Sequence, residues 1–319
     1  DDAYALFTSQ QRDLAETMNN FTKDYKETIS DRNRLLIENE TLREQVGTLT
    51  NENGEISQQA QEQIKNAELL FPLIRKKTEE RKEKKTVISV SGGSGVGKTG
   101  MAFLLQNMFE KQGKKSLIIS GDNYPHRIPM YNDAERIARF RMFGLNGLIT
   151  ERLYTDEVKE KLLELQKAGR DAEEQEDMQW LSIYQKYGDK ALTDYLGTDQ
   201  ELDYEAVSNL LMQFHGGTSQ LLLRHMGRTP DDIWYDRRDV SDTDILILEW
   251  THGNSAYLQG VDVSVVLIST PEETLENRKK RNRDTAIDSP FVARVLRIEQ
   301  KKIDDGLDRA DIIQDMHGR

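Results

Sequence analysis

The stretch VISVSGGSGVGKT, residues 87–99, joins a short β-branched run to a glycine-rich loop that satisfies the pattern GxxxxGK[ST]. An apolar helical stretch, Met101 to Phe109, follows directly. In this order of strand, loop and helix, several backbone N–H groups converge on phosphate oxygens, and the helix N-terminus adds its positive dipole end. The residues predicted to bind nucleotide phosphates are Gly92, Gly93, Ser94, Gly95, Val96, Gly97, Lys98 and Thr99. We expect Lys98 to reach the β and γ phosphates and the Thr99 hydroxyl to bind Mg²⁺.

Short β-branched runs alternate with helical segments on the carboxyl side of this loop. These runs are residues 117–120, 245–248 and 263–268. Such alternation implies right-handed crossovers and a parallel sheet covered by helices on both faces. The sequence therefore predicts an α/β domain with a doubly wound parallel sheet over residues 86–319.

One region of this domain departs from the alternation. Between Asp133 and Tyr195 the chain is long, polar and helical, and it carries no strand signal. Two roles for this helical insertion, residues 133–195, are equally compatible with the pattern. It could form a lid or substrate subdomain, or it could provide a further interaction surface.

Carboxylates stand at the ends of two predicted strands. Glu249 closes the buried run 245–248, which would bring it close to the phosphate loop as a ligand of Mg²⁺. Asp244 opens the same run and is the competing candidate, but it lies at the end of the strand away from the ligand crevice. Asp122 follows the run 117–120 and could orient or deprotonate an acceptor hydroxyl. The alternative is a turn aspartate that caps its own backbone.

A basic run, Arg278 to Asp284, follows the last predicted strand and is a local exception in an acidic protein. On a helical segment, its side chains could close over a transferring phosphoryl group and neutralise the charge that develops there. A solvated basic helix is the alternative.

The amino-terminal 70 residues contain two glycines and no proline, and apolar residues recur every four and three positions from Leu14 to Leu70. This heptad pattern predicts a long α-helical coiled coil. Asn39 and Asn53 fall at a positions, where paired amides favour a parallel homodimer in register. The alternative is a single helix folded back on the rest of the chain. Pro72 is expected to end or kink the rod, and the basic stretch 71–85 to form a solvated linker.

The composition excludes several classes of protein. No cysteine is present, which rules out a disulfide framework, a thiolate zinc site and a thiol nucleophile. With 44 basic and 56 acidic residues, the formal charge of −12 predicts that neither nucleic acid nor an anionic membrane is a partner. No apolar run approaches the ~18 residues that span a bilayer, and no charged-then-apolar leader opens the sequence, so we expect a cytoplasmic protein.

Residues 86 to about 303 resemble the uridine kinase and phosphoribulokinase branch of P-loop kinases. The resemblance rests on residues 88–99, 120–124, 244–249 and 278–284. It implies that ATP and Mg²⁺ are used to phosphorylate a hydroxyl of a small metabolite. It also implies an acceptor-side base role for Asp122, a metal or active-site carboxylate role for Glu249, and lid roles for Arg281 and Arg283.

The sequence departs from that family on the acceptor side. Uridine kinases carry an Asn-Phe-Asp-His-Pro stretch and a Tyr-Asp pair in a substrate hairpin, whereas residues 197–204 and 221–226 here read GTDQELDY and LLLRHM. We therefore expect the acceptor to be a sugar, a nucleoside or another alcohol. A rival hypothesis is a dimeric ATP-dependent switch, in which the rod transmits the nucleotide state to a partner and no metabolite is phosphorylated.

Overall fold

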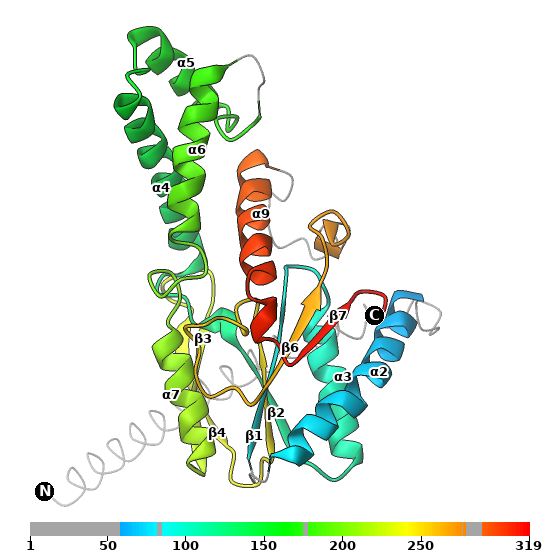
Figure 1. Ribbon diagram of the computed structural model, residues 1–319. Helices are drawn as coiled ribbons and strands as arrows, with labels where there is room; N and C mark the ends of the chain where they lie inside the picture. The colour runs from blue at the N-terminus through cyan, green and yellow to red at the C-terminus, as the bar shows by residue number, and fades with distance from the viewer. Residues whose placement is uncertain (1–57, 82–84, 175–177, 276, 279–288) are drawn as a thin grey trace, which may run out of the picture. The chain divides into compact units, whose positions relative to one another are not determined.

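The computed structural model describes residues 58–81, 85–174, 178–275, 277–278 and 289–319. The chain divides into two compact units, residues 1–61 and 62–319. The candidate site lies in the second unit, whose fold is drawn in Figure 1. The heptad positions before residue 58, including Asn39 and Asn53, lie outside the described residues. So do Arg281 and Arg283 of the basic run.

A parallel sheet of five strands forms the centre of the second unit, in the order β2-β5-β1-β6-β7. The strands are β1 (Thr86–Gly92), β2 (Ser116–Ser120), β5 (Ile245–Glu249), β6 (Val263–Ile268) and β7 (Ile312–Asp315). Every residue of β1 and β5 is buried, as expected for β-branched runs at the centre of a parallel sheet covered on both faces. The predicted α/β class and parallel sheet are confirmed. The sequence did not predict β7, a four-residue edge strand that is defined by its pairing with β6.

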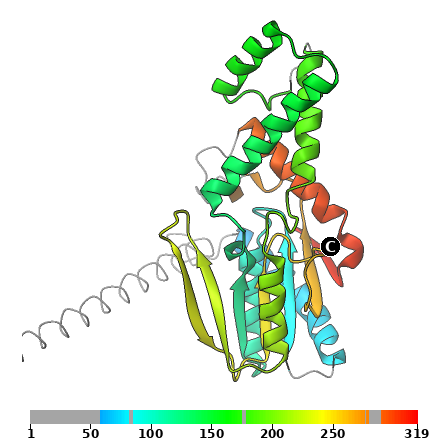
Figure 2. The ribbon, with the colours of Figure 1, turned by 90° about the vertical axis from the view of Figure 1, so that its left-hand side faces the viewer.

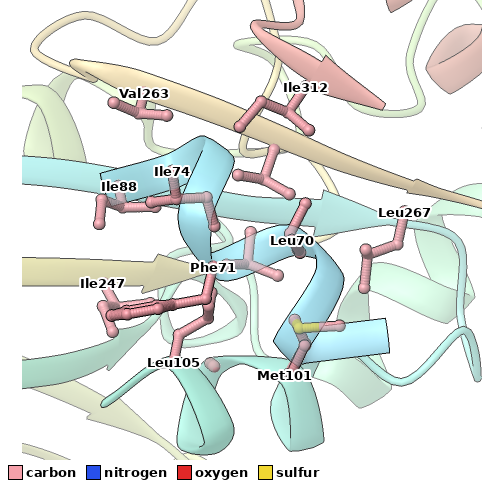
Figure 3. Close-up of a cluster of buried hydrophobic side chains, with 14 of the residues drawn as sticks. Leu70, Phe71, Ile74, Ile88, Met101, Leu105, Ile247, Val263, Leu267 and Ile312 are labelled. Carbon is pink, nitrogen blue, oxygen red and sulfur yellow. The ribbon is translucent and has the colours of Figure 1, made fainter. Parts of the chain in front are cut away.

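Two helices, α2 (Gln58–Glu80) and α3 (Lys98–Lys111), pack over one face of the sheet. Figure 3 shows the side chains Leu70, Phe71 and Ile74 of α2 against the α3 helix and the strands. The strand residues in this cluster include Ile88, Ile247, Val263, Leu267 and Ile312. Phe71 meets Phe109 of α3 edge-on, with ring centroids 4.8 Å apart. This packing makes α2 part of the core that supports the glycine-rich loop.

The domain boundary expected at residue 70 is corrected by α2. The helix continues through Pro72 to Glu80, so the proline does not end it. Leu70, which was expected to lie in a coiled-coil seam, is 1% exposed within the unit's own core. The stretch 71–85 is not simply a solvated linker, because Arg81 pairs with Asp262 at 2.7 Å. The boundary at residue 70 was wrong because apolar residues spaced by three and four occur both in a helix stripe that faces a core and in a coiled-coil seam.

The opposite face of the sheet is covered by α7 (Tyr204–His215). Val207 and Phe214 of this helix share a buried cluster with Leu246 and Leu248 of β5. A separate antiparallel hairpin, β3 (Gln220–Met226) with β4 (Ile233–Asp239), follows α7 in the chain and is clearest in Figure 2.

The helical insertion forms a cluster with its own core. Its helices are α4 (Pro129–Thr150), α5 (Asp156–Lys167) and α6 (Gln179–Thr193), with no strand among its described residues. A fourth helix, α9 (Pro290–Asp304), packs against it through Arg294, which donates to the Asp189 carboxylate at 2.6 Å. Figure 1 shows α9 between this insertion and the sheet. Among the described helices, none is both long and apolar enough to cross a membrane.

Candidate active site

The glycine-rich loop connects the end of β1 to the start of α3, as the sequence predicted. Gly92 has φ +142°, and a Cβ at this position would collide with the Leu267 carbonyl oxygen of β6. Gly97 has φ +102° and is the residue immediately before α3. Both positions need backbone conformations that other residues rarely adopt. The loop can therefore lie close to β6 while the N-terminus of α3 faces the same edge of the sheet.

Lys98 and Thr99 occupy the first turn of α3. The Lys98 side chain is buried, and its ammonium donates to the Gly93 carbonyl oxygen at 3.0 Å, across the loop. Thr99 is half-buried beside it. An ammonium group and the N–H groups of a helix N-terminus, held together around a glycine loop, are suited to bind a phosphate.

Two buried donors beside the loop lack partners within the described part of the structure. These are the Ser269 hydroxyl, which follows β6, and the Arg278 Nε. Arg278 lies close to Gly95, since a Cβ there would be 2.9 Å from the Arg278 Cγ. Neighbouring Asn277 donates to the Gly95 carbonyl oxygen at 3.1 Å. Because buried polar groups normally have partners, the residues around the loop fit a phosphate-bearing nucleotide.

Glu249 and Asp244 lie at opposite ends of β5. The strand register places Glu249 level with Val90 and Ser120, at the carboxyl ends of β1 and β2. Its side chain is buried. At the other end, the Asp244 carboxylate accepts the backbone N–H of Lys115 at 3.0 Å. Glu249 is therefore the carboxylate at the loop's edge of the sheet. Its oxygens and the Thr99 hydroxyl are of the hard type that Mg²⁺ prefers, so these two residues could hold the ion.

Asp122 lies in a short 3-10 turn, Gly121–Asn123, directly after β2. Its side chain is exposed, and its carboxylate accepts no hydrogen bond from any described residue, so it does not act as a cap for its own turn. The turn is instead held by its neighbours: Arg224 of β3 donates to the Asn123 carbonyl oxygen at 2.8 Å, and the Asn123 side chain accepts from the Met226 N–H at 3.1 Å. Asp122 thus presents a free carboxylate at the same sheet edge as Glu249.

The two stretches in which the sequence departs from uridine kinases lie beside Asp122. Residues 197–204 run along the turn, where the His126 N–H donates to the Glu201 carbonyl oxygen at 2.9 Å and the Asp203 N–H to the Tyr124 carbonyl oxygen at 2.8 Å. The other stretch, residues 221–226, lies within β3 of the hairpin. Both flank the free carboxylate of Asp122.

The structure adds an ionic cluster that the sequence did not predict. Arg136 of the insertion bridges Glu201, at 2.7 Å, and Glu299 of α9, at 3.2 Å. Burial raises the pKa of Glu299. For Arg136, the carboxylates of Glu299, Glu201 and Asp133 outweigh the effect of burial, so the pKa of its guanidinium rises. No sequence spacing marks this cluster, because its members are 65 and 163 residues apart.

A small cavity of about 180 Å³ adjoins the carboxyl ends of β1 and β5. Its lining includes Ser91, Gly197, Thr251, His252 and Lys302. Burial lowers the pKa of the His252 imidazole to about 4, so that this ring is neutral at pH 7 and can both donate and accept a hydrogen bond. The polar side chains among its lining residues could therefore bind the hydroxyl groups of a small molecule.

The family model of Zeta toxin matches residues 73–142 of the chain. A bifunctional α-galactosidase/sucrose kinase, AgaSK of Mediterraneibacter gnavus, is 36% identical over 253 residues, which are 79% of this chain and 22% of that protein. The chain thus spans about a fifth of the length of that relative. The predicted resemblance to P-loop kinases is confirmed by these matches.

Two solved structures align with most of the chain at low sequence identity. A protein described as a fructose transport system kinase, from a Silicibacter species, has a TM-score of 0.49 at 13% identity, covering 78% of this chain and 98% of its own. A protein described as a possible uridine kinase, from Bacillus stearothermophilus, has a TM-score of 0.42 at 16% identity, covering 78% of this chain and 97% of its own.

Proposed function

We propose that this protein is an ATP- and Mg²⁺-dependent kinase that phosphorylates a hydroxyl of a small metabolite, and that the acceptor is a sugar. The observation that carries the proposal is the free carboxylate of Asp122, which lies at the same sheet edge as the phosphate loop and Glu249. A nucleotide switch needs a phosphate loop and a metal carboxylate. A kinase also needs a group that prepares an acceptor hydroxyl.

The described residues have distinct roles in the proposed transfer. Lys98 and the N-terminus of α3 hold the phosphates, and Thr99 and Glu249 hold Mg²⁺, which neutralises phosphate charge when bound. Asp122 orients the acceptor hydroxyl and takes its proton. The acceptor oxygen forms a bond to the γ phosphorus while the bond from that phosphorus to the bridging oxygen of ADP breaks. The products are the phosphorylated acceptor, ADP and one proton on Asp122.

A sugar acceptor is supported by two observations. The relative with 36% identity is named in part as a sucrose kinase, and a phosphate loop belongs to a kinase rather than to a glycoside hydrolase. The lining of the cavity near His252 includes a hydroxyl, an imidazole and an ammonium group, from Thr251, His252 and Lys302. Groups of this kind can satisfy several sugar hydroxyls at once.

The test is acceptor-dependent formation of ADP. The purified 319-residue chain is incubated with MgATP and a panel of mono- and disaccharides, nucleosides and other alcohols, and the Lys98→Ala variant is the blank. We expect ADP formation to rise with one or more sugars and the phosphorylated sugar to appear in equal amount. ADP formation that no acceptor changes would favour the switch hypothesis, and a response to nucleosides alone would reject the sugar.

We further propose that the segment before residue 58 assembles the chain as a parallel homodimer in the cytoplasm. The support is the heptad pattern with Asn39 and Asn53 at a positions. Light scattering should give a dimer for the full chain and a monomer for residues 58–319. A dimer of the shortened chain would move the interface to the kinase-like unit.

A further inference from the structure

Arg136 connects three separate parts of the chain at the site. It lies on α4 of the insertion, and its guanidinium contacts Glu201, which precedes α7, and Glu299, which lies on α9. The two carboxylates have different environments. Glu201 is completely buried, whereas the Glu299 side chain is 14% exposed.

Glu201 is a fixed anchor for Arg136. One of its carboxylate oxygens accepts from the Arg136 Nε at 2.7 Å and from the Asn132 amide at 2.9 Å, and the other accepts from the Gly197 N–H at 2.6 Å. A buried carboxylate that loses its cation is strongly destabilising. We therefore expect the contact between Arg136 and Glu201 to be kept when a ligand binds.

Glu299 lies at the mouth of the phosphate loop. It lines a pocket of only about 10 Å³ together with Gly93, Ser94 and the next residue of α9, Gln300. Gln300 is so close to the loop that a Cβ on Gly93 would lie 2.7 Å from its side-chain oxygen. Besides burial, which raises the pKa of Glu299, the charge of Lys98 lowers it and that of Asp122 raises it, so both charged groups act on this carboxylate.

A carboxylate in this position opposes the arrival of a triphosphate, since both carry negative charge. The guanidinium that now neutralises Glu299 has five N–H donors, more than it uses for Glu201, Glu299 and the exposed Asp133 at 3.8 Å, in a planar fork that suits phosphate oxygens. The guanidinium can therefore exchange Glu299 for a phosphoryl group while it still contacts Glu201.

We propose, resting on the kinase function proposed above, that Arg136 is a catalytic residue that contacts the γ-phosphoryl group. When the triphosphate binds, the guanidinium keeps Glu201 and exchanges Glu299 for phosphoryl oxygens. Glu299 holds Arg136 in place until then. The helical insertion thus supplies a cation to the reaction, the role that the sequence suggested for the basic run after β6.

The test compares the binding of a triphosphate with that of a diphosphate to the 319-residue chain. Calorimetry gives Kd for the magnesium complexes of β,γ-imido-ATP and ADP, and their ratio isolates the γ-phosphoryl contact. Arg136→Lys should weaken binding of the triphosphate by about 10-fold or more and leave that of ADP unchanged, because one ammonium cannot serve both Glu201 and the phosphoryl group. Glu299→Gln should strengthen triphosphate binding by about fivefold, because a like charge is removed.

Arg141→Lys is the matched control. Arg141 lies on the same helix and also pairs with a buried carboxylate, Asp171, at 2.9 Å, but within the insertion's own core. This variant should keep the wild-type ratio. Glu299→Gln retains the Arg136 contact with Glu201, so it decides the question even if Arg136→Lys fails to fold.

Two results would overturn the inference. An unchanged ratio in folded Arg136→Lys or in Glu299→Gln would leave Arg136 as a structural ion pair. Weaker triphosphate binding by Glu299→Gln would make that carboxylate a ligand rather than an obstacle. Binding alone is measured, so these outcomes are distinct from failure of the proposed kinase function, which would show as nucleotide binding without acceptor-dependent turnover.

Discussion

The phosphate-loop side of the site and the side around Asp122 are built in different ways. The loop places its groups within one short stretch, and the Lys98 ammonium bonds a carbonyl oxygen only five residues earlier. The opposite side draws Arg136, Glu201 and Glu299 from three elements, with 65 and 163 residues between partners. Local chain geometry is sufficient for the first side. The second depends on how the insertion, α7 and α9 pack together.

The largest effect should come from the local side. Lys98→Ala should lower phosphoryl transfer by about 10³-fold or more, because the ammonium stabilises charge on the transferring group. The fold should remain, and circular dichroism and thermal unfolding are the controls. Turnover at the wild-type rate in a folded variant would show that this loop does not hold the reacting nucleotide.

Asp122→Asn tests one carboxylate on the second side of the site. The amide keeps the shape of the side chain but cannot take a proton, so acceptor-dependent turnover should fall by about 10²- to 10⁴-fold. The Kd of MgATP should barely change, since the exposed carboxylate is not part of the loop. Normal turnover would mean that Asp122 is only a turn residue and would remove the main support for a kinase.

Glu249→Gln and Asp244→Asn compare the two ends of β5. Loss of the Glu249 carboxylate should lower Mg²⁺-dependent turnover by about 10²-fold and keep part of the nucleotide binding. Asp244→Asn should affect turnover little, because this side chain lies at the far end of the strand. Titration of the turnover of each variant with Mg²⁺ measures both effects. The reverse ranking would exchange the two assignments.

Two truncations test whether α2 belongs to the core that supports the loop. Removal of residues 1–57 should leave the free energy of unfolding of the second unit nearly unchanged. Removal of residues 1–70 should lower it by about 3 kcal/mol or more, because buried Ala67 and Leu70 are lost. It also removes Gln63, whose side chain lies against Gly97 and Gly100 at the start of α3. Urea unfolding measures both, and equal stability of the two fragments would contradict this role of α2.

The smallest effect concerns His252. Burial lowers the pKa of this imidazole from 6.5 to about 4, so between these pH values the unfolded chain binds a proton that the folded chain does not. Stability contributed by the neutral ring is present above pH 6.5 and is lost as the pH falls toward 4. As the pH falls from 7 to 5, the free energy of unfolding should therefore decrease in His252→Asn by about 1 to 2 kcal/mol less than it does in the wild type. Urea unfolding at both pH values measures the difference.

Substitution of the exposed His126 by Asn is the control for that comparison. An identical pH dependence in the wild type and in His252→Asn would show that the ring titrates alike in the folded and unfolded chains.

Sequence-based prediction succeeded for the elements that local sequence defines and failed for those that depend on how distant parts of the chain pack. The buried strands at 245–249 and 263–268 were predictable because continuous β-branched runs leave few alternatives for a chain of this composition. The end of the amino-terminal helix was not predictable. Ala67 and Leu70 have the spacing of a coiled-coil seam, and only the presence of a sheet surface to cover decided that they pack intramolecularly.

By itself, the sequence determined the phosphate loop, the parallel sheet and the ends of the strands on which Glu249 and Asp122 lie. Each depends on interactions among residues close in the chain or on a strongly periodic pattern. Only the tertiary structure decided that Arg136 joins Glu201 to Glu299. A buried charge must find its partner wherever the packed elements bring one, and its position in the sequence carries no mark of which partner that is.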